Sequence, residues 1–285
     1  MLEWILILLG QNALGYLLFL FAGLFFGLFG SGGSIIMLPI LVYIFQLPFE
    51  VAKIYSLLLI FLIAFIGTIQ HYKAKNLNLK KTLFFIFPTL IFTAFSTLFL
   101  FPKIPLEITF FNIVYPKQSF LMIIFSIVIF SSAFSILLSK SIKMKYHSNI
   151  ILIFTGILVG VLTGLLGIGG GFIIVPALIL FANMNMKQAA SSALFIIMLN
   201  TLLAIPLAVG TLQHFQLNLS NNIIIGSGMT TPFQLEFIAF LLVSGVLGII
   251  IGIKILNRID VNVTKKMFSI TLLLLSLVIF FIELL

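Results

Sequence analysis

Ten apolar runs, almost free of charged residues, constrain this chain more than any other feature of its sequence. Charged residues make up 7% of the chain and hydrophobic residues 62%, whereas a soluble domain carries about a quarter charged residues. Such a chain cannot cover itself with a water-facing surface, so it must lie in a lipid bilayer, and a soluble enzyme and a disordered protein are excluded. The runs are residues 4–29, 34–47, 54–70, 82–101, 118–139, 150–166, 172–182, 188–211, 234–253 and 267–282.

The positive charge of the chain lies mainly in the short segments between the apolar runs. The net charge is +9, from 15 Lys and Arg residues against 6 Asp and Glu residues. In a soluble protein this excess would indicate nucleic acid, but between apolar runs it sets membrane topology, so we expect no nucleic-acid partner. Cysteine is absent, which excludes disulfides and Cys-ligated metals, and we expect no metal site and no cofactor.

Part of the sequence occurs twice, 137 residues apart. Residues 23–39 read GLFFGLFGSGGSIIMLP and residues 160–176 read GVLTGLLGIGGGFIIVP, with eight of the 17 positions identical. The segment GTIQHY at 67–72 also matches GTLQHF at 210–215. Two matches in the same order indicate an internal duplication. The prediction is therefore one integral membrane domain, made of a first transmembrane repeat (1–139), a basic cytoplasmic linker (140–149) and a second transmembrane repeat (150–285).

The charges of the loops orient the two repeats. Loop 71–81 holds four lysines, whereas its counterpart 212–233 holds no charged residue. The positive-inside rule then places the first loop, the linker and the basic loop 254–266 inside, and loop 212–233 outside. The two repeats are therefore predicted to be inverted, with both termini outside. Each repeat has about five segments, arranged either as five crossings or as three crossings and a re-entrant hairpin.

A glycine-rich turn lies between a long and a short apolar run in each repeat. Glycine permits a sharp turn, and a helix that starts there directs free N–H groups and its positive dipole end at an anion. Two such helix ends, one from each repeat, are expected to converge on one small oxyanion, and the alternative is a role in packing. The residues of the turns are Gly30, Ser31, Gly32, Gly33 and Ser34, and Gly167, Gly169, Gly170 and Gly171. Helix packing is predicted for Gly23, Gly27, Gly156, Gly160, Gly164, Gly248 and Gly252, which are spaced four residues apart.

These glycine motifs resemble those of the sulfite exporter TauE/SafE family of membrane permeases. Members of that family carry two copies of the motif, each followed by a helix start of the type A-x-G-T-S-L, which here reads AKIYSL at 52–57 and AASSAL at 189–194. The resemblance covers nearly the whole chain in the order of its segments. It implies transport of small anions, chiefly sulfite and organosulfonates, without ATPase machinery, and the sequence agrees in having no G-x-x-x-x-G-K-[ST] motif.

Serine and charged residues near the short segments are further candidates. Ser56 and Ser192 either cap the helix that follows each short segment or face the anion. The charged residues Glu50, Lys53 and Lys187 are expected to be solvated in loops.

Two pairs of polar residues occupy equivalent places in the duplication. Gln70 and Gln213 are expected to donate amide hydrogen bonds to the anion. Because histidine titrates near neutral pH, His71 and His214 either couple protons to transport or anchor the helix ends at the membrane interface.

The predicted fold class is an all-α polytopic membrane protein of two inverted repeats, with helices broken or re-entrant at the Gly-Gly turns. The predicted function is secondary transport of a small oxyanion by alternating access in the bacterial inner membrane, with a proton or counter-ion as a possible coupling partner. The alternatives are an anion channel and a carrier of another small organic anion, and an oligomer is left open. An enzyme and a cation carrier are disfavoured, because the apolar runs hold no catalytic constellation and no deep carboxylate.

Overall fold

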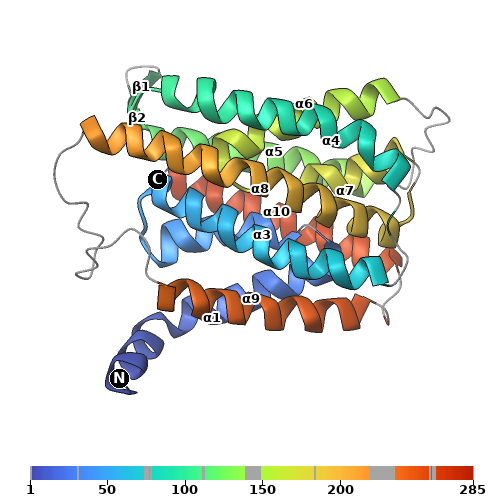
Figure 1. Ribbon diagram of the computed structural model, residues 1–285, viewed down its shortest axis with the longest axis horizontal. Coiled ribbons are helices and arrows are strands. Elements are labelled where there is room, and N and C mark those ends of the chain that lie inside the picture. Colours follow the sequence, from blue (N-terminus) through green and yellow to red (C-terminus); the bar gives the residue numbers. More distant parts are fainter. Residues whose placement is uncertain are drawn as a thin grey trace.

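Helices make up most of the chain in its computed structural model (Figure 1). The structure describes residues 2–30, 32–73, 77, 79–110, 113–138, 149–182, 184–218, 235–256, 258 and 261–284. The first half holds α1 (Leu2–Phe29), α2 (Gly32–Pro39), the π-helical turn η1 (Ile40–Ile44), α3 (Phe49–Lys73), α4 (Leu79–Phe95), the π-helical turn η2 (Ser96–Leu100), the 3-10 turn η3 (Phe101–Lys103), β1 (Glu107–Phe110), β2 (Ile113–Pro116) and α5 (Lys117–Leu138). The second half holds α6 (Asn149–Leu166), α7 (Gly171–Leu180), α8 (Met186–Asn218), α9 (Leu235–Leu256) and α10 (Val261–Leu284).

Each half contains three helical segments that are long and apolar enough to cross a bilayer. Within the described residues there are six such segments, which belong to α3, α4 with its continuation, α5, α8, α9 and α10. A helix pair precedes them in each half, α1 with α2 and α6 with α7, and the pair is broken at the glycine-rich turn. A bilayer offers backbone groups no hydrogen bonds, so apolar runs satisfy their own backbone as helices. The predicted all-α polytopic membrane fold, with helices broken at the Gly-Gly turns, is confirmed.

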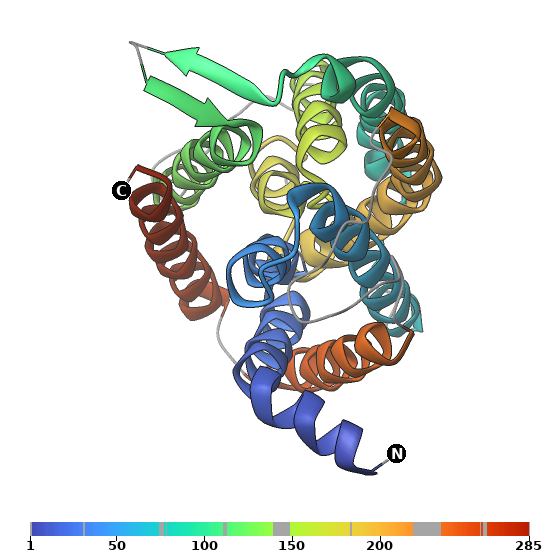
Figure 2. The same cartoon turned by 90° about the vertical axis from the view of Figure 1, so that its left-hand side faces the viewer.

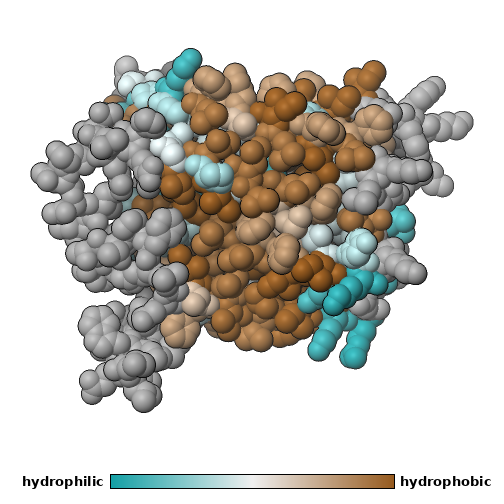
Figure 3. All heavy atoms as spheres, viewed as in Figure 1, coloured by the Kyte–Doolittle hydropathy of each residue, from teal (hydrophilic) through white to brown (hydrophobic). Residues whose placement is uncertain are grey.

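The outer surface of the bundle is apolar. Phe87 and Phe154, for example, are 66% and 69% exposed. Figure 3 shows hydrophobic side chains covering the middle of one face, with hydrophilic residues toward its ends. A monomeric soluble protein rarely exposes an apolar area of this extent, so the surface matches a protein bounded by lipid.

A short β-hairpin between α4 and α5 is absent from the prediction. Strands β1 and β2 pair antiparallel, with Glu107 opposite Pro116 and Phe110 opposite Ile113. The hairpin lies beside α5 at one end of the bundle (Figure 2). Both strands have four residues, which is too short for an alternating pattern to stand out against apolar neighbours.

The helices of the two halves contact each other in a matching pattern. Helix α1 packs on α9 of the other half, and the equivalent helix α6 packs on α4. The equivalent helices α3 and α8 pack on each other, and so do α5 and α10 (Figure 2). Short helices α2 and α7 also touch, and most of their residues are buried. This is the contact pattern that a twofold relation between the halves would produce, and the inversion of one half relative to the other stays a prediction.

Glycine allows the helix backbones to approach closely at the two equivalent interfaces. A Cβ added to Gly23 of α1 would lie 2.1 Å from the carbonyl oxygen of Gly245, and one added to Gly248 of α9 would lie 2.1 Å from that of Leu20. At the other interface, a Cβ on Gly160 of α6 would lie 2.5 Å from the carbonyl oxygen of Thr89. The packing role predicted for these spaced glycines is confirmed.

Helix α8 begins with a capping box that the prediction missed. The Gln188 N–H donates to Asn185 Oδ1 at 2.9 Å, and the Asn185 N–H donates to Gln188 Oε1 at 3.4 Å. Ser192 lies further inside the helix, so the capping role considered for it is wrong. Ser56 is likewise the eighth residue of α3 and does not cap it.

The glycine contacts predict a position-dependent response to alanine. Gly248→Ala places a methyl group against the α1 backbone and is expected to cost about 1–3 kcal/mol through overpacking. Gly210→Ala in α8 is the matched control, since an added Cβ there meets nothing within 4 Å. The apparent Tm in detergent should fall for the first variant and hold or rise for the second. Equal Tm values for both variants would contradict the packing role.

The α8 cap predicts a second contrast. Asn185→Ala removes the cap oxygen and is expected to destabilise the protein by about 1 kcal/mol. Ser192→Ala removes a buried hydroxyl that has no hydrogen-bond partner among the described residues, so stability should stay the same or increase. Thermal unfolding of both variants in the same detergent measures the contrast, and a larger loss for Ser192→Ala would refute this assignment of the cap.

Candidate anion site at the second glycine turn

The two glycine turns begin with the same local geometry. Gly30 and Gly167 both have a φ of 73°, in the left-handed region that favours glycine. The Gly30 N–H donates to the carbonyl of Phe26 and the Gly167 N–H to that of Thr163, both at 2.8 Å. These bonds end α1 and α6 with the same C-terminal cap. Ser31 of the first turn lies outside the described residues.

The short helices fold back onto the helices before them through further glycines. A Cβ on Gly33 would lie 2.0 Å from the carbonyl oxygen of Ala22, and one on Gly170 would lie 2.4 Å from Cγ1 of Val159. These glycines therefore pack α2 on α1 and α7 on α6. A bulky substitution at Gly33 or Gly170 would disrupt this packing, so it cannot by itself test anion binding.

Each glycine turn rests on the opposite half of the chain. A Cβ on Gly30 would lie 2.4 Å from Cα of Ala190 in α8, and one on Gly167 would lie 2.4 Å from Cγ of Lys53 in α3. Ala190 and Lys53 are equivalent positions, 137 residues apart. A Cβ on Gly67 of α3 would lie 3.1 Å from Leu194, one helical turn beyond Ala190. Gly169 of the second turn also reaches α8, since a Cβ there would lie 3.0 Å from Cγ2 of Ile197, two helical turns beyond Ala190. Convergence of the two turns on one small anion stays a prediction.

Unpartnered polar groups lie beside the second turn. The buried Thr163 Oγ1 would be 3.0 Å from a Cβ on Gly170, and it has no hydrogen-bond partner among the described residues. The side-chain amide nitrogen of buried Asn200 also lacks a partner there, while Asn200 Oδ1 accepts a hydrogen bond from Thr93 at 2.5 Å. Thr201, the residue after Asn200, has its methyl group 3.5 Å from the Cβ position of Gly169. Buried polar groups are usually satisfied, so the two unpartnered groups mark this turn as a candidate binding site.

The backbone at the start of α7 adds hydrogen-bond donors to this site. Gly170 is the N-cap and Gly171 the first residue of α7. The first N–H groups of a helix have no partner within it, and the dipole makes this end positive. The turn, the Thr163 hydroxyl and the Asn200 amide therefore present donors suited to an oxyanion.

Other hydroxyls near the site form hydrogen bonds between α6 and the helices α4 and η2 that pack on it. Thr93 shares its one hydroxyl proton between Asn200 Oδ1 at 2.5 Å and the carbonyl of Gly160 at 3.2 Å, and Ser96 donates to the carbonyl of Val161 at 2.8 Å. The close approach at the α6 glycines places these carbonyls within reach. These hydroxyls hold α4 against α6, whereas the Thr163 hydroxyl and the Asn200 amide nitrogen have no hydrogen-bond partner among the described residues.

Lys53 is not the solvated loop residue that the sequence predicts. It is only 2% exposed, because α3 begins at Phe49 and its second turn packs against the end of α6. The Lys53 Nζ donates to the carbonyl oxygen of Gly164 at 2.5 Å and lies 3.5 Å from the ring centroid of Phe101. A buried lysine side chain therefore lies beside the second turn, where the first turn has Ala190. The lysine opposite an alanine in the duplicated sequence is a signal that could have identified this residue.

The remaining predicted site residues are scattered. Ser34, Ser56 and Ser192 are fully buried, and the hydroxyls of Ser56 and Ser192 have no hydrogen-bond partner among the described residues. Gln70 is half-buried, and His71, at 4% exposure, is more buried than an interfacial anchor. The side chains of Gln213 and His214 lie outside the described residues, so proton coupling by the histidine pair stays a prediction. The described residues contain no group of three or more His, Cys, Asp or Glu suited to a metal ion.

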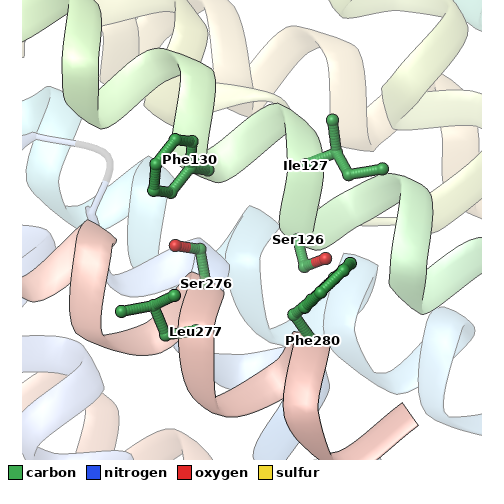
Figure 4. Close-up of a pocket in the computed structure, with 6 residues that line it drawn as sticks. All are labelled: Ser126, Ile127, Phe130, Ser276, Leu277 and Phe280. Atoms are coloured by element: carbon green, nitrogen blue, oxygen red, sulfur yellow. The ribbon is translucent and has the colours of Figure 1, made fainter. Parts of the chain in front are cut away.

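A cavity of about 240 Å³ between α5 and α10 is not part of this site (Figure 4). Its two hydroxyls are satisfied within their own helices, since Ser126 donates to the carbonyl of Ile123 and Ser276 to that of Leu273. The cavity is therefore unsuited to an anion. Its lining residues are Ser126, Ile127, Phe130, Ser276, Leu277 and Phe280.

Comparison with known proteins agrees with this architecture. A protein of Methanocaldococcus jannaschii described as a "probable membrane transporter protein" is 29% identical over 190 residues, which cover 63% of this chain and 66% of that protein. No solved structure matches the chain. Residues 15–280 match the family described as sulfite exporter TauE/SafE. The chain is therefore an integral membrane protein that belongs to the sulfite exporter TauE/SafE family.

Proposed function

We propose that this protein is a secondary transporter that binds a small oxyanion at its second glycine turn. The observation that carries the proposal is the pair of buried, unpartnered groups beside that turn, Thr163 Oγ1 and the amide nitrogen of Asn200. The printed descriptions of the family and of the archaeal relative support a transporter. The absence of a nucleotide-binding G-x-x-x-x-G-K-[ST] motif favours a gradient as the driving force.

The chemistry of the donors favours a tetrahedral or pyramidal oxyanion. Three kinds of donor are available around the turn, namely the Thr163 hydroxyl, the first N–H groups of α7 and the amide of Asn200, which Thr93 links to Gly160 of α6. Several acceptor oxygens on one small anion satisfy such a set, as sulfite and small organosulfonates do. The Lys53 ammonium lies next to the turn and compensates the charge that the anion brings into an apolar bundle.

Each glycine turn contacts a helix of the opposite half, and this arrangement suits alternating access. Both turns contact the α3–α8 pair, since Gly30 meets Ala190 of α8 and Gly167 meets Lys53 of α3. Rocking of one half against the other at this pair changes both turn environments together. In this proposal the second turn binds the anion, and the exchange of α3–α8 contacts opens it to one side and then the other.

An anion channel is the alternative that uses the same site. Counterflow separates the two, because a carrier exchanges labelled for unlabelled anion and accumulates label transiently, whereas a pore does not. Radiolabelled sulfite in proteoliposomes is the first probe. If no label accumulates in tight, correctly loaded vesicles, sulfite is excluded as a substrate, and organosulfonates are tested next.

The assignment of the site is tested by two substitutions of similar size. Thr163→Val removes the unpartnered hydroxyl and is expected to lower kcat/KM for the anion about tenfold or more. Asn200→Asp keeps the oxygen that accepts from Thr93 but replaces the donor nitrogen with oxygen, so a larger loss is expected.

Ser126→Ala is the matched control for these variants. It also removes a buried hydroxyl, but one that lies between α5 and α10 and bonds its own helix. Its initial counterflow rate should equal that of the wild type at the same amount of inserted protein. Wild-type transport by Thr163→Val and Asn200→Asp would exclude the second turn as the binding site.

A further inference from the structure

Two lysines share one aromatic ring at the hairpin end of the bundle. The Lys53 Nζ lies 3.5 Å from the ring centroid of Phe101, and the Lys117 Nζ lies 3.8 Å from it. Phe101 begins η3 and Lys117 begins α5, on either side of the hairpin. Glu50, the second residue of α3, lies 4.0 Å from Lys117. These four residues, Glu50, Lys53, Phe101 and Lys117, are called the vestibule cluster below.

The vestibule cluster carries more positive than negative charge. The two lysine nitrogens lie within about 7 Å of each other, so they repel at the low dielectric of a protein interior. Glu50 forms an ion pair with Lys117 and also interacts electrostatically with Lys53, whose hydrogen bond goes to a neutral carbonyl. A buried lysine without a full counter-charge is costly to ionise, and a bound anion lowers that cost.

Stability alone does not explain lysine at these positions. Lys117 is the first residue of α5 and Lys53 lies in the second turn of α3, close to the positive ends of the two helix dipoles. Such positions favour anions and disfavour cations. The equivalent of Lys53 in the second repeat is Ala190, which supports the first glycine turn without any charge. Packing against a glycine turn therefore does not need the lysine.

Burial increases along the cluster toward the second glycine turn. The Glu50 side chain is 25% exposed and that of Lys117 is 9% exposed, whereas Lys53 is 2% exposed. Lys53 then contacts Gly164 and Gly167 at the turn itself. The cations thus form a path from the partly exposed end of the bundle to the candidate anion site.

We propose that Lys117 and Lys53 form a second anion site, at which the transported anion binds on its way to the second glycine turn and displaces the Glu50 carboxylate. Glu50 is then a resident counter-charge that competes with the anion for Lys117. The inference rests on the proposed function, since it takes the same small oxyanion as its ligand.

Opposite effects of two neutralising substitutions test this role. Glu50→Gln removes the competitor and is expected to lower the Kd for radiolabelled sulfite about threefold to tenfold. Lys117→Gln removes a cation and is expected to raise the Kd by about tenfold or more. Lys103→Gln is the matched control, because Lys103 ends η3 but is exposed, and its Kd should be unchanged. Equilibrium binding to purified protein in detergent measures all three, with toluenesulfonate as a second probe.

The outcomes separate this inference from the proposed function. If Glu50 and Lys117 form only a structural ion pair, both variants lower the Tm and leave the Kd unchanged or move it in the same direction, which overturns the vestibule site. If the wild type binds neither probe, the proposed function and the vestibule site both fall for these anions. If the wild type binds and Thr163→Val does not, while Glu50→Gln and Lys117→Gln match the wild type, only the vestibule site falls. Misfolding cannot mimic the tighter binding expected of Glu50→Gln.

Discussion

Close approach of helix backbones across glycine is the contact on which this bundle depends. Lipid removes most of the hydrophobic drive for helices to associate, so packing and backbone contacts must hold them together. The glycines of α1, α6 and α9 meet carbonyl oxygens of the facing helices at the two equivalent interfaces. On the α4–α6 side, the same approach lets Thr93 and Ser96 reach α6 carbonyls. The scaffold that positions the second turn is thus built from contacts without charge.

The duplication supplies two similar backbones that carry different polar groups. Gly30 and Gly167 share their φ and their capping hydrogen bond. The side chains around them differ, since Thr163 corresponds to Phe26 and Lys53 to Ala190. These two replacements add polar groups beside the second turn, whereas Ser31 and Ser34 of the first turn correspond to Ile168 and Gly171. The two copies of the motif thus share a backbone geometry and differ in side-chain chemistry.

Local sequence patterns were enough to predict the helices, but they did not predict contacts between residues far apart in the sequence. Hydropathy and glycine spacing located the membrane segments, the two breaks and the packing faces, because each depends on residues near in sequence. Lys53 was misjudged because the groups that bury it come from α6 and η3, far along the chain. The hairpin and the Asn185 cap were missed because their signals are four residues long. The glycine turns were located from the sequence, but the polar neighbours on which a binding role depends, such as Lys53, come from elsewhere in the chain.

Each glycine turn rests on the opposite half of the chain, and this has a consequence for biosynthesis. Gly30 rests on Ala190, which the ribosome adds only after the whole first half and part of the second have been made. The first helix pair must therefore wait in the bilayer with its turn unsupported, while the second turn finds Lys53 already in place. The second half is synthesised last, and it provides the contact that supports the first turn. Packing of the first turn is therefore completed only after the second half has been made. Two halves supplied as separate chains would each lack the support for their own turn until they met.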